Sequence, residues 1–310
     1  MRSLGPCWVF YVLFVGATAA MAQGGDARDS FSHADFFSLL RPDHADITLG
    51  GLYEPEHEEK DGPGSYSLKK FSGSGELLAP LGRDLYLRGG LEYAASLYDF
   101  DLVSGARTSI GEETLHRAVL NGGIGMFLSE NVLVTGVGSL GIYSDFDEGI
   151  DLDHAAIYGS GMLVYRVNPG AQLLLGIERS EVFDETPLFP LLGLRLLSED
   201  GKLHFSLTLP LEARIGWHLS SQSELYVRGR ISGERYRIAA GPENTEFSVS
   251  VRDQRVGLGA QLWFGEHVGV TLEGGLAVGS ELEFKVRDAG QFDGELKEAG
   301  YLSCELGFAL

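Results

Sequence analysis

Cysteine is almost absent from this chain of 310 residues, which contains only Cys7 and Cys304. Cys7 lies in an N-terminal segment that has the features of a secretory signal, so cleavage would leave a single cysteine. One cysteine excludes an intramolecular disulfide and a cysteine-based metal site. Neither a disulfide framework nor a cysteine-rich metal centre can therefore hold this protein together.

Long hydrophobic runs and basic residues are also scarce. No segment after residue 22 approaches the ~18 uninterrupted apolar residues of a transmembrane helix, which excludes helical membrane spans. The chain has 24 Lys and Arg against 44 Asp and Glu, for a formal net charge of −20. We expect no nucleic-acid partner, because phosphate binding needs clustered basic side chains.

The signatures of common enzyme classes are missing too. The sequence contains no GxSxG, HExxH or phosphate-binding P-loop motif. A cluster of Asp151, Asp153 and His154 could in principle activate water, so a barrel-embedded hydrolase stays as a third alternative. We expect no enzyme and no cofactor.

The N-terminus predicts export. Arg2 is followed by an apolar run from Trp8 to Val15 and by small residues that end at Ala20-Met21-Ala22. This order is typical of a secretory signal, with cleavage expected after Ala22. Cys7 precedes the apolar run, which excludes it as a lipoprotein attachment site. We expect a cleaved signal at 1–22, a periplasmic segment at 23–45 and one domain at 46–310.

What the sequence has in abundance is alternation. In LHFSLTLPLEARIGW (203–217) every second residue is apolar, and both charges lie between apolar positions. A period of two indicates a β-strand, and fifteen residues exceed the ~9–11 that a tilted transmembrane strand needs. Pro210 predicts a bulge or bend within this strand. A long strand of a soluble β-sandwich is the alternative.

The connections between such stretches alternate strictly between short and long. The short ones are 80–84, 129–131, 168–170, 219–223 and 265–267, and the long ones are 54–63, 98–113, 144–153, 181–202, 239–247 and 281–299. Outer-membrane barrels combine short periplasmic turns with long extracellular loops. The sequence therefore predicts an all-β fold, a transmembrane antiparallel up-and-down β-barrel of about twelve strands, with its location in the bacterial outer membrane.

One segment is difficult to place in this count. PLFPLLGLRLL (187–197) lies in a predicted outer loop but is apolar enough to form a strand. Either it is an excursion of that loop, or its partner strand is hidden and the barrel has fourteen strands. The even parity of the other connections favours twelve.

The predicted outer loops hold nearly all of the excess charge. Six windows within them sum to a net charge of −20, equal to that of the whole chain. The most acidic is DFDEGIDLD, in which the residues Asp145, Asp147, Glu148, Asp151 and Asp153 could bind a divalent cation and so bridge to anionic outer-membrane lipid. A simple solvated surface is the alternative, and the spacing predicts no specific metal site.

Further along, the chain resembles a known family. Pro210, Arg214, Ile215 and Trp217, followed by YRI (236–238), RVGLG (255–259) and LEGG (272–275), look like a family of bacterial outer-membrane β-barrels of unknown function. The resemblance covers roughly the second half of the chain. It implies an outer-membrane location and carries no activity with it.

The polar face of the strands predicts the interior of the barrel. We expect Arg and Glu side chains to pair across the lumen, where water is limited; they are Arg88, Glu92, Glu178, Glu212, Arg214, Arg228, Arg230 and Glu273. These residues favour a narrow channel that passes small solutes or ions. A closed structural or ligand-binding barrel without transport is the alternative.

Overall fold

The structure is a computed structural model that describes residues 44–60, 64–101, 112–146, 155–179, 188–240, 245–265, 267–286 and 290–310. Every regular element in these ranges is a β-strand. Within the same ranges, no helix is long and apolar enough to cross a membrane. The expected signal and N-terminal segment, 1–22 and 23–45, lie almost wholly outside the described residues and stay predictions.

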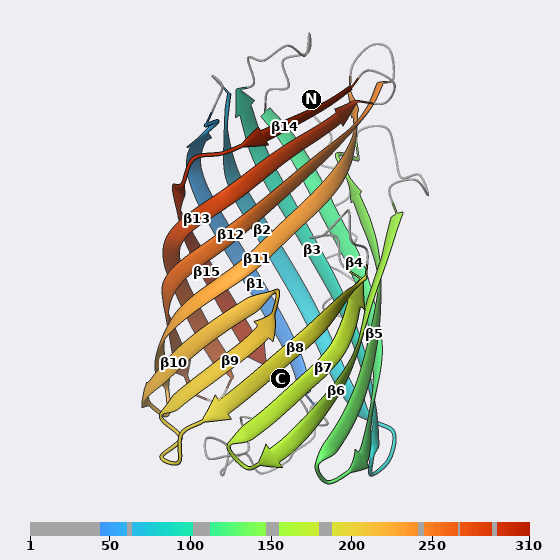
Figure 1. The fold of residues 1–310 in the computed structure, drawn as a ribbon, viewed down its shortest axis with the longest axis vertical. Coiled ribbons are helices and arrows are strands. Elements are labelled where there is room, and N and C mark those ends of the chain that lie inside the picture. Colours follow the sequence, from blue (N-terminus) through green and yellow to red (C-terminus); the bar gives the residue numbers. More distant parts are fainter. Residues whose placement is uncertain are drawn as a thin grey trace.

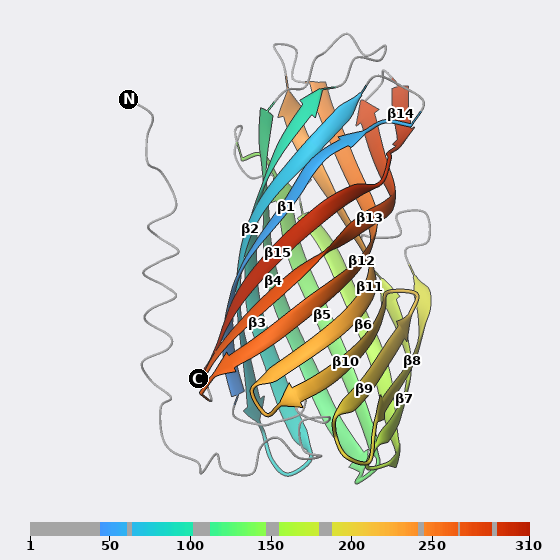
Figure 2. The same cartoon turned by 90° about the vertical axis from the view of Figure 1, so that its left-hand side faces the viewer.

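Fourteen of the fifteen strands close into one antiparallel barrel (Figures 1 and 2). The ring closes because β12 pairs with β13, β13 with β15, and β15 with β1. The short β14 pairs with residues 281–286 of β13, above the residues 268–277 that pair with β15, so it continues the position of β15 toward the loop end. The strands are β1 His44–Glu58, β2 Ser65–Pro80, β3 Leu85–Asp101, β4 Glu112–Ser129, β5 Val132–Ser144, β6 Ala155–Asn168, β7 Ala171–Arg179, β8 Phe189–Leu197, β9 Leu203–Leu209, β10 Glu212–Ser220, β11 Ser223–Ala240, β12 Thr245–Phe264, β13 Val268–Val286, β14 Gly290–Glu295 and β15 Ala299–Ala309.

The expected count of twelve strands is wrong, and the alternative of fourteen is confirmed. The stretch 203–217 is a hairpin of β9 and β10 that turns at Pro210 and Leu211, so the single long strand does not exist. The segment 187–197 is no excursion of a loop, because its residues from Phe189 onward form β8, which pairs with β9. The missing partner strand was therefore hidden inside the most regular alternation of the chain.

The predicted apolar and polar faces of residues 203–217 are correct although the segment is a hairpin, and the reason is the register of its two strands. Thr208 lies opposite Glu212 and Ser206 opposite Arg214, so even-numbered residues face even-numbered residues across the turn. A hairpin with this register keeps the alternation in phase, since side chains of paired residues lie on the same face. The apolar residues of both strands consequently point the same way, as they would in one strand.

The two ends of the barrel differ. All five predicted short turns join strands at one end, which we call the turn end, and a sixth turn at 198–202 joins β8 to β9 there. In this sixth turn Asp200 accepts hydrogen bonds from the Ser198 hydroxyl and the Lys202 amide, which lower the pKa of its carboxyl group. The other end, the loop end, receives the remaining connections, and strands extend into several of the predicted loops there.

The strands β7 to β10 on one side of the barrel are short, and we call this side the low wall. Strands β7 to β10 contain seven to nine residues each, whereas β11, β12 and β13 contain 18 to 20. Near the loop end β11 passes above these short strands and meets β5, where Arg237 pairs with Ser144 in parallel. Five strands, β6 to β10, separate β5 from β11 at the turn end. The barrel is therefore wide at the turn end and pinched at the loop end.

The pinched end has a packed apolar interior. Its buried side chains come from strands all around the loop end, and they include stacked and edge-to-face aromatic rings such as Tyr98 against Phe100. The cluster consists of Tyr66, Leu68, Tyr98, Phe100, Leu115, Val119, Tyr143, Tyr236, Val249, Val251, Leu282, Phe284 and Leu296. This packing closes the interior of the barrel toward the loop end.

Glycines make room for inward-facing tyrosines along the wall. A Cβ atom on Gly125 would lie 2.1 Å from the ring of Tyr86, and one on Gly257 would lie 2.2 Å from the hydroxyl of Tyr301. Each ring therefore lies flat across the backbone of a neighbouring strand where only a glycine leaves space. The many glycines of the sequence serve close packing inside the barrel as well as its turns.

Candidate functional site

The barrel interior is the candidate site, and it is lined by ion pairs between neighbouring strands. Arg228 of β11 and Glu212 of β10 form a pair with 2.5 Å between Nη2 and Oε2. Arg214 of β10 and Glu224 of β11 form another with a distance of 2.6 Å. Arg214 lies opposite Arg228 and His218 opposite Glu224. Glu212 is therefore one inward position along from the residue opposite Arg228, and Glu224 is two inward positions along from the residue opposite Arg214.

Glu273 of β13 is the centre of the next group. It is 3% exposed and accepts hydrogen bonds from the hydroxyls of Tyr226 and Tyr301, at 2.9 and 2.8 Å. Arg230 lies 3.7 Å from one of its oxygens and Arg228 3.9 Å from the other. A buried carboxylate is tolerated here because cations and donors surround it.

The opposite wall carries two more of the expected residues. Arg88 of β3 pairs with Glu76 of β2 at 2.6 Å, and Glu92 pairs with Arg117 of β4. The structure therefore brings Arg88 and Glu92 into ion pairs, but with partners that differ from the residues expected around them. The eight expected residues form separate groups on the two walls and no continuous ladder.

Glu178, the remaining expected residue, lies at a polar pocket. The pocket has a volume of about 220 Å³ and lies where the upper ends of β6 and β7 face β3, β4 and β5. Its lining is mainly polar, and Val119, Val137, Tyr143 and Tyr158 form its apolar part. The lining residues are Glu92, Arg117, Val119, Asn121, Val137, Ser139, Tyr143, Tyr158, Gly159, Ser160, Glu178 and Arg179.

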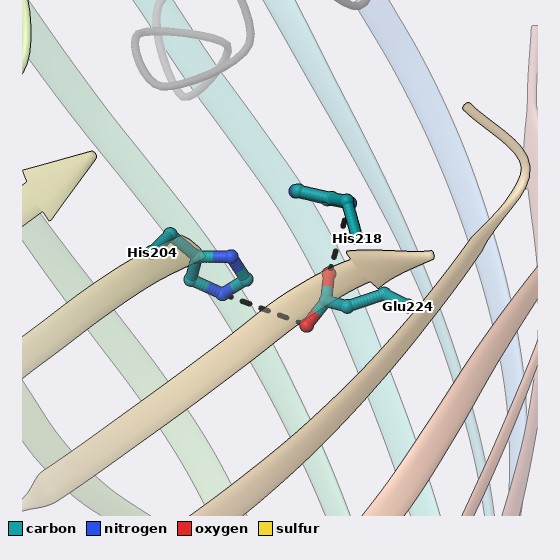
Figure 3. A group of neighbouring side chains, drawn as sticks. All are labelled: His204, His218 and Glu224. Atoms are coloured by element: carbon teal, nitrogen blue, oxygen red, sulfur yellow. Dashed lines mark ion pairs between the residues drawn. The ribbon is translucent and has the colours of Figure 1, made fainter. Parts of the chain in front are cut away.

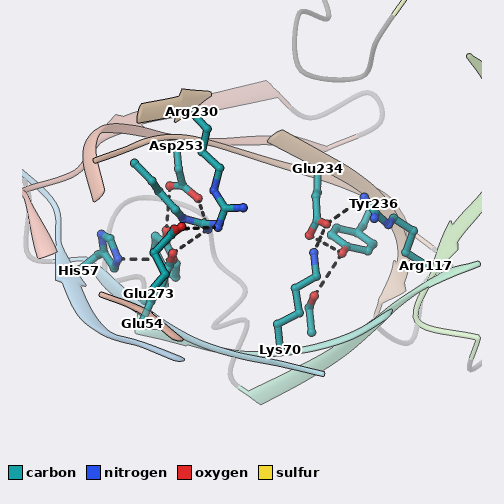
Figure 4. Close-up of polar contacts among 12 residues, drawn as sticks. Glu54, His57, Lys70, Arg117, Arg230, Glu234, Tyr236, Asp253 and Glu273 are labelled. Atoms are coloured by element: carbon teal, nitrogen blue, oxygen red, sulfur yellow. Dashed lines mark hydrogen bonds and ion pairs between the residues drawn. The ribbon is translucent and has the colours of Figure 1, made fainter. Parts of the chain in front are cut away.

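Two charge clusters near the loop end were not expected from the sequence (Figure 4). In the first, Arg255 of β12 lies 2.6 Å from Glu54 and 2.8 Å from Asp253, and His57 lies 3.6 Å from Glu54. Glu54 and His57 are fully buried. The sequence assigned both to the outer loop 54–63, but β1 continues to Glu58 and turns them inward.

The second cluster joins opposite walls. Lys70 of β2 and Glu234 of β11 form an ion pair across the interior, and Arg117 of β4 lies 3.2 Å from the same carboxylate. Tyr236 donates a hydrogen bond to Glu234 at 2.7 Å. Figure 4 shows Lys70 and Glu234 reaching toward one another from facing strands. The only sequence signal for this contact is that all of these residues take inward positions of their strands.

Exposure changes along the axis of the barrel. The side chains of Arg88 and Glu76 are 45% and 43% exposed, whereas Glu54 and His57 are 0% exposed. Glu212 and Arg214, which lie between these extremes, are 33% and 23% exposed. Exposure of the charged side chains in the interior therefore falls from the Arg88–Glu76 pair to the Glu54–His57 pair.

The predicted cation loop is only partly described. Asp145, which directly follows β5, is buried and accepts a hydrogen bond from the Ser144 hydroxyl at 3.1 Å. The other four residues, Asp147, Glu148, Asp151 and Asp153, lie outside the described residues, as does His154. Cation binding by this loop and hydrolysis by the His154 cluster stay predictions.

These features define a closed antiparallel β-barrel with a charged interior, and the family follows from the sequence match. Residues 112–306 match the family described as a domain of unknown function (DUF6268), which is more than half of the chain. The protein belongs to this family. The expected membership in a family of unknown function is confirmed, and the match begins before the second half of the chain.

Comparison with solved structures finds other barrels. The COG4313 outer membrane channel from Pseudomonas putida F1 is 8% identical, with 93% of this chain and 100% of that chain covered and a TM-score of 0.48. The toluene transporter TodX from P. putida is 10% identical, with 90% of this chain and 92% of that chain covered and a TM-score of 0.42.

The translocator domain of autotransporter NalP from Neisseria meningitidis is 13% identical, with 89% of this chain and 95% of that chain covered and a TM-score of 0.40. These three proteins are a channel, a transporter and a translocator domain. No curated protein matches the chain.

Proposed function

We propose that this protein is an outer-membrane channel for small solutes, with a side entrance above the low wall. In this proposal the turn end faces the periplasm and the loop end faces outward, as in other outer-membrane barrels. The observation that carries it is the polar pocket of about 220 Å³ at the upper ends of β6 and β7, below the contact between β5 and β11.

An apolar belt supports the membrane location. Large apolar side chains on the outer face are about half exposed or more all around the barrel, for example Phe71, Ile157, Leu175, Trp217 and Leu258. Soluble monomers rarely expose apolar patches beyond a few hundred Å². The nine residues of β7, β8 and β10 match the ~9–11 that a tilted membrane-spanning strand needs.

The difference in strand length supports a side route. If β7 to β10 just span the hydrocarbon layer, then β11 to β13 extend well beyond it on the loop side. The packed aromatic cluster blocks a straight path along the axis at that height. A solute would enter above the short strands, pass the polar pocket and continue through the ion-paired interior to the periplasm.

The test is solute entry into liposomes that contain the refolded barrel. Ser139 lines the pocket, while its neighbour Leu140 is exposed on the outer face. Ser139→Trp should abolish the solute-dependent swelling seen with the wild type, and Leu140→Trp should leave it unchanged. Equal swelling of both variants would exclude a route through the pocket, and no swelling of the wild type would exclude the channel.

A closed structural or binding barrel is the second candidate, and the buried charge clusters favour it. Glu54, His57, Asp253 and Arg255 fill the interior at one level and are at most 9% exposed. Under this alternative the wild type is silent in planar bilayers, although it shows the heat-dependent gel migration of a folded barrel. Discrete conductance steps would contradict it.

A further inference from the structure

We infer that His204, His218 and Glu224 form a binding site for one transition-metal ion, of the type Zn²⁺, Cu²⁺ or Ni²⁺. The three side chains come from the consecutive strands β9, β10 and β11 and converge on one point of the interior (Figure 3). One ligand atom of each lies within 4.8 Å of the other two. Two imidazoles and a carboxylate are a common ligand set for such ions.

The register of the three strands produces this convergence. His218 lies opposite Glu224 on β11, while His204 on β9 lies opposite Gly216 on β10. His204 Nε2 is 3.5 Å from Glu224 Oε1, and His218 Nδ1 is 3.9 Å from Glu224 Oε2. Ligand atoms around a tetrahedral ion with bonds of ~2.1 Å are ~3.4 Å apart, so small side-chain rotations would complete the site.

Gly216 is what allows residues of β9 and β11 to meet across β10. A Cβ atom at this position would lie 2.1 Å from His204 Cε1 and 2.5 Å from Glu224 Oε1. Between Arg214 and His218, β10 therefore has no inward side chain of its own, and the His204 ring fills the space above Gly216. Any larger residue at position 216 would push the two ligands apart.

Arg214 keeps the carboxylate in place. Its Nη2 lies 2.6 Å from Glu224 Oε1, and its guanidinium stacks on the Tyr226 ring at 3.9 Å from the centroid. With Oε1 held by Arg214, Oε2 is the oxygen left to bind an ion together with the two imidazoles. A partner that orients a metal-binding carboxylate in this way is a common feature of metal sites.

The site is reachable, unlike the other His–Glu pair of the interior. The His204, His218 and Glu224 side chains are 18%, 34% and 10% exposed, whereas Glu54 and His57 are 0% exposed. His218 is two residues from the end of β10, so the cluster lies near the turn end of the interior. An ion that enters from the turn end would meet three protein ligands and keep a position for water.

The experiment is a calorimetric titration of the refolded full-length mature chain in detergent with ZnCl₂. We expect one ion per barrel, and a loss of more than about tenfold in affinity for His204→Gln and for His218→Gln, since each removes one of three ligands. His116→Gln is the matched control, because His116 stacks on Phe146 and lies outside the cluster. Heat-dependent gel migration confirms that every variant is folded.

A second pair of variants separates the site from general effects of substitution. Gly216→Ala should weaken Zn²⁺ binding as strongly as loss of a histidine, whereas Gly229→Ala on β11 should not, because a Cβ there meets no atom within 4 Å. With Cu²⁺ as the probe, electron paramagnetic resonance should show two imidazole nitrogens in the wild type and one in His218→Gln. No binding by the wild type, or unchanged binding and spectra in the histidine variants, would overturn the inference. The outcome is independent of solute conduction.

Discussion

At the scale of single residues, buried charges in this barrel are acceptable only as members of pairs. Glu234 is 13% exposed and faces both Lys70 and Arg117 from the opposite wall. Such a pair is weak evidence for net stability, because desolvation offsets much of the attraction. Removal of one partner is strongly destabilising, because the other charge is then left unpaired in a closed interior.

We predict that Glu234→Ala lowers the free energy of unfolding by about 3–5 kcal/mol, because it leaves Lys70 and Arg117 without their shared carboxylate. Urea titration in detergent micelles would measure this. The control is Glu295→Ala, whose partner Lys60 lies 3.1 Å away in an exposed pair at the barrel rim. That change should cost at most about 1 kcal/mol, and equal effects would contradict the reasoning.

The glycines beneath tyrosine rings allow a similar prediction. Gly257→Ala would place a Cβ 2.2 Å from the Tyr301 hydroxyl, and that ring is held by its hydrogen bond to Glu273. Overpacking of this kind typically costs about 1–3 kcal/mol of stability. Gly161→Ala, where a Cβ meets no atom within 4 Å, should change the urea midpoint little. A similar shift for both variants would mean that the ring moves freely.

At the scale of elements, the low wall distinguishes this barrel from a uniform cylinder. The β9–β10 hairpin turns at Pro210 and Leu211, level with the middle of the tall neighbour β11, since Glu212 lies opposite Arg230. β11 thus extends ten residues beyond the level at which β9 and β10 meet their turn. The proposed side entrance depends on this difference in strand length between β7–β10 and β11–β13.

The hairpin can be tested by thiol accessibility in liposomes. In a Cys304→Ala background, which removes the exposed native thiol, Leu211→Cys should react with a membrane-impermeant maleimide because it lies in a turn. Leu207→Cys, within β9, should be protected because its side chain would face lipid. Protection of both positions would support one continuous strand over 203–217 and contradict the fourteen-strand barrel.

At the scale of the whole molecule, closure of the ring removes every unpaired strand edge from the wall at the turn end. Closure depends on β15, which pairs with β1 on one side and with β13 on the other. By contrast, β14 pairs only with the part of β13 nearer the loop end, above β15. The two neighbouring segments therefore have different importance for the assembled barrel.

We predict that deletion of residues 299–310 prevents formation of a barrel, so that the heat-dependent shift in gel migration disappears. Replacement of residues 290–295 by a Gly/Ser linker of equal length should retain the shift, because β15 still pairs with β1 and β13. A heat-modifiable band from the deletion variant would show that β1 and β13 can close the ring by themselves.

The sequence by itself determined the all-β class, the alternation of side chains between two faces and five of the short turns. Alternation specifies a strand locally, because successive side chains point to opposite faces whatever the partner strand is. The inward placement of Arg214, Arg228 and Glu273 followed from this rule, as did all five short turns. The family match agrees with the resemblance seen in the second half of the chain.

Only the tertiary structure decided the strand count and the contacts across the interior. The turn at Pro210 keeps the alternation in phase, so the sequence of β9 and β10 reads the same as one strand. The meeting of Lys70 with Glu234, and of His204 with Glu224 across Gly216, depends on strand register and barrel curvature. Register is a property of paired strands, and a local pattern within one strand does not contain it.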